Sequence, residues 1–395
     1  MLQERSHLWL PFTQMHSFDS RARTFIAAEG TTLVDVRGRR LYDAVSSIWT
    51  TIHGHCHPAI VAAIAQQAAT LDHATTLGAS NPVAEELARR LCGISGMDFA
   101  FFASDGASAV EASLKMALQY WRHAAQPQRT RFLRFVDAYH GDTSGAMSVS
   151  DIATFKTHFG AITIETIPYG GAVDLERPDV AAAIVEPMVQ AAAGMRVVPA
   201  ERYAALRECK PLVIVDEIAT GFGRTGTMFA FEQLALQPDI LTLGKGITGG
   251  ALALSATLVT ERVYDAFLGA PDDRKQFFHG HSYAGNPIAC AAAVASLQLF
   301  EREGTLDNAR LLGAGIAAQC DGLRSEEKVR DVRRCGTMTG IELCGRSAAE
   351  VADALYERGH FTRAIGEVVQ FVPPLSSTVA EADAFFDALR AVLAS

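Results

Sequence analysis

Short apolar runs alternate with helical patterns between about residue 58 and residue 290. The strand-like runs are apolar at nearly every position, as expected of strands that are buried on both faces of a parallel sheet. They cover residues 99–102, 131–136, 182–185, 212–215 and 240–243. Helical patterns lie at residues 58–71, 82–92 and 107–124. This alternation predicts an α/β fold, in which crossover units build a mostly parallel sheet with helices on both faces.

The pattern changes at both ends of the chain. Residues 26–45 alternate like a hairpin, with turn signals at Glu29-Gly30 and Arg37-Gly38. The C-terminal part mixes helical patterns with strand-like runs at 338–343 and 368–372. We therefore predict one small α+β domain built from both chain ends. The expected division is an N-terminal segment at 1–50 that contributes to the small domain, a large domain at 51–295, and a C-terminal small domain at 296–395.

Composition and charge favour a protein that acts on small molecules. The 395 residues are 49% hydrophobic and 20% charged, which is ordinary for a globular protein. The net charge of −9 disfavours a nucleic-acid partner or an anionic membrane surface, because either needs clustered Lys and Arg. The longest apolar stretch, 288–300, is Ala-rich and interrupted by Ser296 and Gln298, so we interpret it as a buried helix.

The seven cysteines are scattered and never spaced as C-x-x-C. This spacing suggests neither a metal site nor a disulfide framework, and reduced thiols in a cytoplasm are the simplest interpretation. The N-terminal residues lack the basic start and apolar stretch of a secretory signal, and no membrane span is expected. We expect a cytoplasmic protein.

Three sequence motifs place polar residues just after predicted strands. Asp216 follows an apolar run and precedes a Gly-rich turn, and Lys245 stands between two glycines after the next run. The segment Ser104–Ser108 follows a third strand and opens a helix, where backbone N–H groups attract phosphate. Each motif has an ordinary alternative when taken alone: a solvated strand end, a surface lysine, or a plain helix N-cap.

Together the motifs describe a phosphate cradle, a carboxylate and a lysine at one crevice, which is what pyridoxal 5'-phosphate needs. Asp216 would keep the pyridine nitrogen protonated, and Lys245 would hold the aldehyde and later move a proton. Tyr139 is placed to stack on one ring face, with Ile218 beneath the other. A half-buried core aromatic is the alternative for Tyr139.

At this point the chain resembles the class III, fold-type I aminotransferases over nearly its whole length. Within them it resembles the branch that aminates 8-amino-7-oxononanoate in biotin biosynthesis. The resemblance rests on HLWLPFTQM (7–15), SSIWTTIHGHCHP (46–58), YHGDT (139–143), DEIATGFGRTG (216–226), PDILTLGKGITGG (238–250), HGHSYAGNPIACAAA (279–293) and TRAIGEVVQFVPPL (362–375). The Asp216 and Lys245 motifs are specific to class III, whereas LPFTQM, SSIW and TRAIG point to the branch.

The resemblance implies roles for individual residues. Lys245 would be the Schiff-base lysine, Asp216 the pyridine partner and Tyr139 the stacking ring. The backbone at Gly106 and Ala107 would cradle the phosphate. Further implied residues are Ser282, which reaches the cofactor of a neighbouring subunit in a homodimer with shared active sites, Arg363, which pairs with the carboxylate of 8-amino-7-oxononanoate, and Trp49, Tyr139, Arg224 and Gly280, which border the substrate.

Two departures from the branch pattern concern the amino donor. Phe12 stands where a tyrosine is usual, and Ile48 replaces the first aromatic residue of the S-S-W-W pattern. Both positions lie near the donor pocket of relatives that use S-adenosylmethionine, so their loss weakens the case for that donor. The HLWLPFTQM and HGHSY versions resemble the relatives that use L-lysine. Both donors stay open.

Other functions remain possible on the sequence alone. A broad ω-amine or ω-amino-acid:pyruvate transaminase would use the same cofactor and lysine, and an aminomutase would rearrange one substrate. A cofactor-binding protein that has lost catalysis is the non-enzyme alternative. Arg363 distinguishes between these enzyme activities, because a substrate carboxylate needs a cation at the far end of an apolar slot and a simple amine does not.

Overall fold

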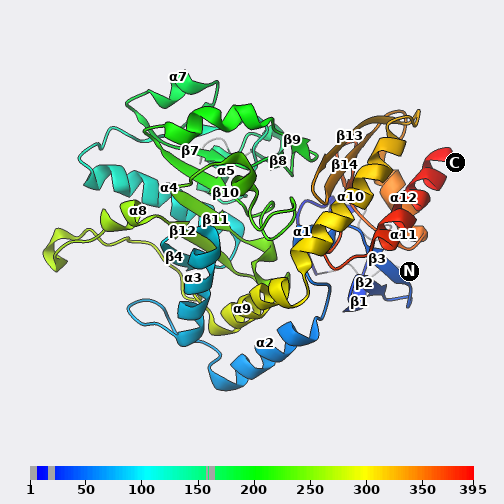
Figure 1. The fold of residues 1–395 in the computed structure, drawn as a ribbon, viewed down its shortest axis with the longest axis horizontal. Helices are drawn as coiled ribbons and strands as arrows, with labels where there is room; N and C mark the ends of the chain where they lie inside the picture. The colour runs from blue at the N-terminus through cyan, green and yellow to red at the C-terminus, as the bar shows by residue number, and fades with distance from the viewer. Residues whose placement is uncertain (1–6, 17–22, 157–158, 160–164) are drawn as a thin grey trace.

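A seven-stranded sheet forms the centre of the larger part of the chain (Figure 1). The structure is a computed structural model that describes residues 7–16, 23–156, 159 and 165–395. The strands are, in spatial order, β4 (Phe99–Ala103), β12 (Ser255–Val259), β11 (Ile240–Leu243), β10 (Leu212–Asp216), β7 (Val180–Val185), β5 (Arg131–Arg134) and β6 (Thr166–Pro168). Only β12 runs against its two neighbours in this sheet, since β11 and β4 both pair with it antiparallel. The predicted α/β fold is confirmed, while β6 and β12 were not predicted.

Helices cover both faces of this sheet. The side chains of Phe132, Ile184 and Ile214 pack against α4 (Gly106–His123) on one face. The intervening side chains, such as Leu133, Val185 and Val215, belong to a second core that includes residues of α3 (Pro82–Ser95) and α9 (Pro287–Arg302). Because successive strand residues point to opposite faces, a continuous apolar run feeds both cores.

The two ends of the chain meet beside the large sheet. The N-terminal strands β1 (Phe25–Glu29), β2 (Thr32–Asp35) and β3 (Arg40–Asp43) are extended by β15 (His360–Phe361), which pairs parallel with β3. A second sheet has the order β13-β14-β17-β16, with β13 (Val329–Cys335), β14 (Met338–Leu343), β17 (Val368–Phe371) and β16 (Ala364–Ile365). Helices α10 (Thr305–Leu323), α11 (Ala348–Glu357) and α12 (Val379–Ala394) pack with these strands (Figure 1).

The predicted hairpin is a three-stranded meander. Its two turns fall at the predicted signals, between β1 and β2 and between β2 and β3. The predicted domain boundaries stay a proposal, and α9 runs through the one at 295/296. Residues 1–6 and 17–22 of the predicted N-terminal segment lie outside the described residues.

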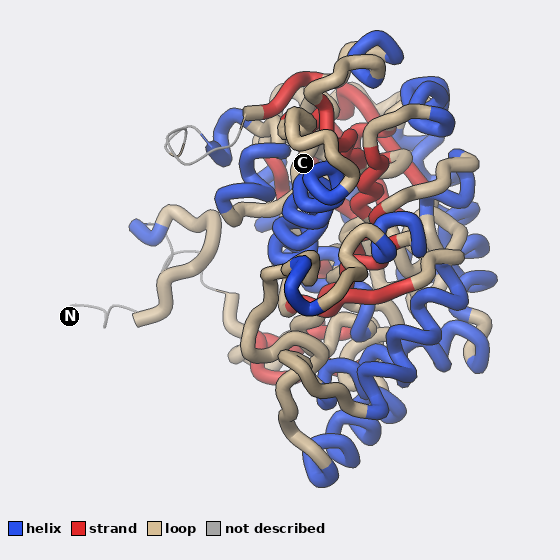
Figure 2. The backbone as a smooth tube through the Cα atoms, turned by 90° about the vertical axis from the view of Figure 1, so that its left-hand side faces the viewer, coloured by secondary structure: helices blue, strands red, loops and turns tan. Residues whose placement is uncertain are grey.

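The remaining elements are short, apart from α2, and connect the sheets. They are α1 (Ser46–Trp49), α2 (Pro58–Thr70), α5 (Ser144–Val149), α6 (Ala153–Lys156), α7 (Ala172–Leu175), α8 (Glu261–Asp265), the strand pair β8 (Val189–Gln190) and β9 (Arg196–Val197), and the 3-10 helices η3 (Ala200–Glu208), η4 (Ala230–Leu234), η5 (Lys245–Thr248) and η6 (Pro271–Asp273). Residues 7–16 lie at the periphery of the molecule (Figure 2), where Phe12 contacts Phe155. Within the described ranges, no helix combines the length and apolarity that a membrane crossing requires.

Candidate active site

The carboxyl ends of three neighbouring strands open on one cavity of about 500 Å³. Strand β10 ends at Asp216, β7 is followed by Glu186, and β11 is followed by Gly244 and Lys245. Since β7, β10 and β11 are parallel, these three side chains lie at the same edge of the sheet. The cavity is lined by Trp49, Asp105, Gly106, Ala107, Tyr139, His140, Gly141, Asp142, Thr143, Glu186, Ala192, Asp216, Ile218, Ala219 and Lys245.

Asp216 is buried and fixed through both carboxylate oxygens. His140 Nδ1 lies 2.6 Å from Oδ2, and neither side chain is more than 4% exposed. The other oxygen, Oδ1, accepts hydrogen bonds from the Ile218 N–H at 3.1 Å and the Thr242 hydroxyl at 3.2 Å. This network holds the carboxylate at one position, as a partner for a charged ring nitrogen requires.

Lys245 begins η5 directly after Gly244 and is partly buried. Burial lowers the pKa of its ammonium group, although the nearby carboxylates of Asp216 and Glu186 act in the opposite direction. Its Nζ lies 5.2 Å from the ring centroid of Trp49. A lowered pKa favours the action of a lysine both as a nucleophile and as a base.

Glu186 is a second buried carboxyl group in the cavity. Its side chain is 5% exposed, and burial raises its pKa to about 7. Oε2 accepts a hydrogen bond from the Tyr139 N–H at 3.0 Å. The group therefore changes its protonation near neutral pH, within the electrostatic reach of His140, Asp216 and Lys245.

The first turn of α4 faces the cavity with unpaired backbone donors. Asp105 is the N-cap and accepts the Ser108 N–H at 2.9 Å, so Gly106 and Ala107 occupy the turn where N–H groups have no helical partner. An added Cβ at Gly106 would lie 2.9 Å from Cγ2 of Ile218. The glycine thus lets the helix end approach Ile218 closely. These donors and the helix dipole fit a phosphate group.

Tyr139 lies at the side of the cavity. Its hydroxyl donates to Asp142 Oδ2 at 2.7 Å, and burial, with this bond second, raises its pKa. Its ring meets Phe155 edge-on at 5.7 Å, and Phe155 in turn meets Phe12 at 5.1 Å. This row of three rings connects the N-terminal segment with the cavity.

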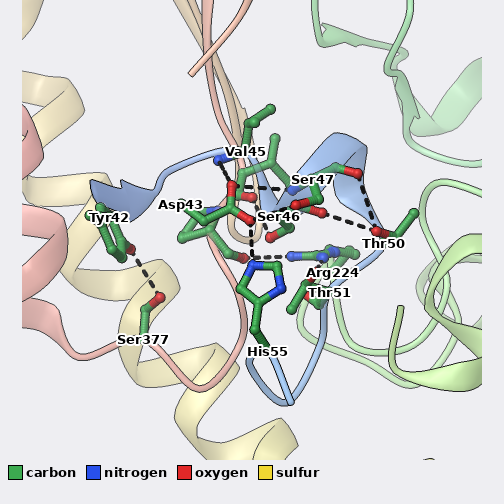
Figure 3. A network of polar contacts seen from close by, with 12 residues as sticks. Tyr42, Asp43, Val45, Ser46, Ser47, Thr50, Thr51, His55, Arg224 and Ser377 are labelled. Carbon is green, nitrogen blue, oxygen red and sulfur yellow. Dashed lines mark hydrogen bonds and ion pairs between the residues drawn. The ribbon is translucent and has the colours of Figure 1, made fainter. Parts of the chain in front are cut away.

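Trp49 also lines the cavity and is 6% exposed. Its Nε1 donates to Gln370 Oε1 at 3.0 Å. It is the last of four successive non-glycine residues with positive φ, at 49°, 46°, 69° and 66° for Ser46 to Trp49. This left-handed turn costs about 1–2 kcal/mol per residue, so surrounding contacts must hold it in place. Figure 3 shows the polar contacts around it.

Four predicted site residues do not line this cavity: Arg224, Gly280, Ser282 and Arg363. Arg224 is 1% exposed and donates to the backbone carbonyls of Thr51 at 2.8 Å and Pro373 at 2.6 Å. Burial lowers the pKa of Arg224 to about 9. Gly280 and Ser282 lie exposed in one loop before α9. The predicted roles of these four residues stay predictions.

Arg363 is exposed between β15 and β16. Its guanidinium has no hydrogen-bond or ion-pair partner within the described part of the chain, and desolvation lowers its pKa. Its carbonyl accepts the Gln370 N–H at 3.0 Å. Arg363 is thus joined through Gln370 to Trp49, although its side chain does not border the cavity.

The structure adds three residues that the sequence analysis did not single out. Glu186 follows a buried parallel strand just as Asp216 does, so the same criterion could have identified it. His140 directly follows Tyr139, but no spacing rule connects it to Asp216. Gln370 carries no local signal, because its contact with Trp49 joins residues more than 300 positions apart.

Comparison with known proteins identifies the family of the chain. Residues 17–393 match the family model described as aminotransferase class-III. An adenosylmethionine-8-amino-7-oxononanoate aminotransferase of Geobacter sulfurreducens is 40% identical, over 98% of this chain and 95% of the relative. The crystal structure of the protein of that name from Methanocaldococcus jannaschii superposes with a TM-score of 0.92 at 36% identity, over 98% of this chain and 97% of that one. An amine transaminase of an uncultivated Pseudomonas species, solved with bound pyridoxal phosphate, gives 0.92 at 31% identity, with 98% of each chain covered.

Proposed function

Because this chain belongs to the class III aminotransferases, which depend on pyridoxal 5'-phosphate, we propose that it converts 8-amino-7-oxononanoate to 7,8-diaminononanoate in biotin biosynthesis. The relatives at about 40% identity that carry this activity in their names support the proposal. The observation that carries it in the structure is Arg363, a guanidinium without a partner among the described residues, joined through Gln370 to the cavity wall at Trp49.

The cavity residues fit the cofactor. The first turn of α4 would hold the phosphate at Gly106 and Ala107, and Asp216, fixed by His140, would hold a proton on the ring nitrogen. When bound, pyridoxal phosphate supplies an aldehyde that condenses with amines and a ring that accepts an electron pair. Tyr139 and Ile218 would bracket the ring from opposite sides.

Lys245 would perform the proton transfers. Its Nζ, whose pKa burial lowers, would take a proton from the substrate carbon that carries the amino group and return one to the acceptor carbon. Glu186 lies close enough to influence this charge, since both groups occupy the same edge of the sheet. Trp49 would cover Nζ on the substrate side and limit the access of water.

Arg363 would pair with the carboxylate of the acceptor. A fork of two parallel hydrogen bonds suits a guanidinium and a carboxylate, and no competing acidic partner among the described residues neutralises this one. In the cofactor-loaded enzyme the apolar chain of the acceptor would then lie along Trp49. A broad amine transaminase, as in the Pseudomonas structure, is the second candidate, and it would not depend on Arg363.

The amino donor is part of the proposal and has two candidates, S-adenosylmethionine and L-lysine. Phe12 lies one ring away from Tyr139 through Phe155, so the N-terminal segment reaches the side of the cavity where a donor would enter. The deciding experiment mixes the yellow pyridoxal form separately with each donor and follows its conversion to the pyridoxamine form. If neither donor reacts while small amines do, the biotin assignment fails and the broad transaminase stands.

We further propose a cytoplasmic homodimer with shared active sites. The exposed loop with Gly280 and Ser282 would supply the Ser282 hydroxyl to the cofactor phosphate of the partner. Sedimentation of the loaded enzyme measures the mass, and a monomer at working concentration would contradict the shared site.

A further inference from the structure

The left-handed turn Ser46–Trp49 is held by groups for which the proposed reaction has no use. Ser46 to Trp49 all have positive φ, and Ile48 is β-branched, which makes this conformation especially unfavourable. The turn still closes helical hydrogen bonds, from the Trp49 N–H to the Val45 carbonyl and from the Thr50 N–H to the Ser46 carbonyl, both at 2.9 Å. Something outside the turn must therefore select this hand.

Asp43, the last residue of β3, makes the hydrogen bonds that hold the turn (Figure 3). Its side chain is fully buried. Oδ1 accepts the N–H groups of Val45 at 3.3 Å and Ser47 at 3.1 Å, and Oδ2 accepts the Ser47 hydroxyl at 3.0 Å. His55 Nε2 lies 2.8 Å from Oδ2 and orients the carboxylate. One carboxylate thus accepts hydrogen bonds from Val45, just before the turn, and from both donors of Ser47 within it.

The backbone on both sides of the turn is tied to the C-terminal part of the chain. The Ala44 N–H donates to the Phe361 carbonyl at 2.9 Å, and the Ser46 hydroxyl donates to the Val372 carbonyl at 2.6 Å. After the turn, the Thr51 carbonyl accepts from Arg224. Because both ends of the turn are held by these hydrogen bonds, the turn cannot relieve its backbone strain by shifting as a rigid unit.

The consequence for the cavity follows from the register. Phe361 pairs with Asp43, and Arg363 lies two residues beyond Phe361. Trp49 lies at the end of the turn, where its ring faces Lys245 Nζ at 5.2 Å. Its Nε1 donates to the Gln370 side chain, and the Gln370 N–H donates to the Arg363 carbonyl. Asp43 therefore contacts both the turn that ends at Trp49 and the strand that leads to Arg363.

We propose that Asp43 is a positioning residue for acceptor recognition: its buried carboxylate holds Ser46–Trp49 left-handed, and thereby fixes the Trp49 indole relative to Lys245 and Arg363. Its role in acceptor choice rests on the proposed function, whereas its hold on Trp49 does not. Asp43 touches neither the cavity nor the reacting atoms.

The first test compares Asp43→Ala with Asp43→Asn in the cofactor-loaded enzyme. Asparagine keeps an oxygen that accepts the Val45 and Ser47 N–H groups, and alanine keeps none. Asp43→Ala should raise KM for 8-amino-7-oxononanoate about tenfold or more, with a smaller change in kcat, and Asp43→Asn should restore most of it. Asp35→Ala is the matched control, because Asp35 is equally buried and accepts the N–H groups of Arg37 and Arg39 away from the cavity.

The second test needs no substrate. The chain has three tryptophans, of which Trp9 is 85% exposed and Trp121 is 3% exposed. In a Trp9→Phe background both remaining tryptophans are buried, and Trp121 packs in a different core from Trp49, so a rise in acrylamide quenching on replacing Asp43 reports the exposure of Trp49. Asp43→Ala should increase the quenching, whereas Asp43→Asn and Asp35→Ala should leave it unchanged.

The two tests separate the possible failures. Unchanged quenching in a folded Asp43→Ala variant, or an unchanged ratio of KM to kcat for an accepted acceptor, overturns the proposal. If Asp43→Ala does not fold, Ser46→Ala removes a single tie to Val372 and should shift both readouts in the same direction by less; no shift there also overturns it. Increased quenching in an enzyme that rejects 8-amino-7-oxononanoate refutes the proposed function and leaves the hold on Trp49 in place.

Discussion

The two sides of the cavity are built in different ways. The strand-end wall, formed by Glu186, Asp216 and Lys245, stands on adjacent parallel strands that are paired along their length. The turn wall, formed by Trp49, is held by the left-handed turn Ser46–Trp49, by Gln370 and by contacts between the two chain ends. In the strand-end wall only Lys245 has a positive φ, at 42°, whereas every residue of the turn has one.

This difference matters because proton transfer and substrate recognition place different demands on the positions of side chains. Groups that exchange protons must keep fixed distances, and a paired sheet supplies them with little local strain. Groups that recognise a substrate can be placed by a strained segment, because its position depends on a few contacts that can vary without disturbing the sheet. We therefore expect changes in the strand-end wall to affect the reaction itself, and changes in the turn wall to affect substrate choice.

The largest expected effect is at Lys245. Lys245→Ala should reduce kcat by at least about 10³-fold, because no other amine lines the cavity among the described residues. Steady-state and single-turnover rates measure this, and Lys210→Ala, at an exposed lysine, serves as the control. A purified Lys245→Ala enzyme with the wild-type rate would refute the assignment.

Arg363, which is joined to the turn wall through Gln370, tests the expected role of that wall in substrate choice. Arg363→Ala should raise KM for 8-amino-7-oxononanoate roughly tenfold to a hundredfold, as the loss of a charged hydrogen-bonded pair does, and should spare an acceptor without a carboxylate. Arg358→Ala, at an exposed arginine nearby, should change neither value. Equal losses for both acceptors would mean that Arg363 serves the fold rather than recognition.

The strand-end wall can also be tested through the pH dependence of stability and of kcat, which we expect to change when Glu186 is replaced. Burial raises its folded pKa to about 7 from 4.5, so it stabilises the fold fully below about pH 4.5 and loses that contribution as the pH rises through 7. Glu186→Gln should therefore flatten the fall in melting temperature between pH 5 and pH 8, and should also remove a transition near pH 7 from the pH profile of kcat.

Glu217 provides the control for this experiment. Burial raises its pKa to about 8, but it lies outside the cavity and binds the Thr220 hydroxyl and the Phe231 N–H. Glu217→Gln should alter the pH dependence of stability and leave that of kcat unchanged. If both variants behave alike, Glu186 has no part in the reaction.

The smallest effect is expected at Ile48. Ile48→Gly removes the Cβ from a residue at φ 69° and should raise the free energy of unfolding by up to about 1 kcal/mol, since glycine accepts this conformation. Ile94→Gly, within the regular helix α3, should lower it by about the same amount. Chemical denaturation compares the two, and a loss at Ile48 equal to that at Ile94 would argue against strain in the turn.

The sequence predicts the strand-end wall far better than the turn wall. Leu212–Asp216 and Ile240–Leu243 are apolar along their whole length, and a polar residue at the end of such a strand marks the ligand edge of the sheet. Lys245 and Asp216 could therefore be named together before any coordinates existed. The strand Ser255–Val259 was missed because its small and hydroxylated residues lack the continuous apolar run.

The turn wall follows from contacts that no local pattern reveals. Ser46–Trp49 contains no glycine, so its local propensity contradicts the conformation that it adopts, and only Asp43 and the C-terminal carbonyls decide it. Gln370 and Trp49 are likewise joined only by the fold. The predicted contribution of Ser282 involves a second copy of the chain, which lies beyond what one chain determines.

The pairing of β3 with β15 also bears on the order in which the structure forms. The Ser46 hydroxyl donates to the Val372 carbonyl, which lies 326 positions further along the sequence, so the turn depends on a contact between distant segments. Contacts between residues so far apart in sequence form late, because the entropy lost on closing the loop precedes the favourable free energy of the contacts. We therefore expect the central sheet to form before the Ser46–Trp49 turn, so that the cavity is complete only once these distant segments have paired.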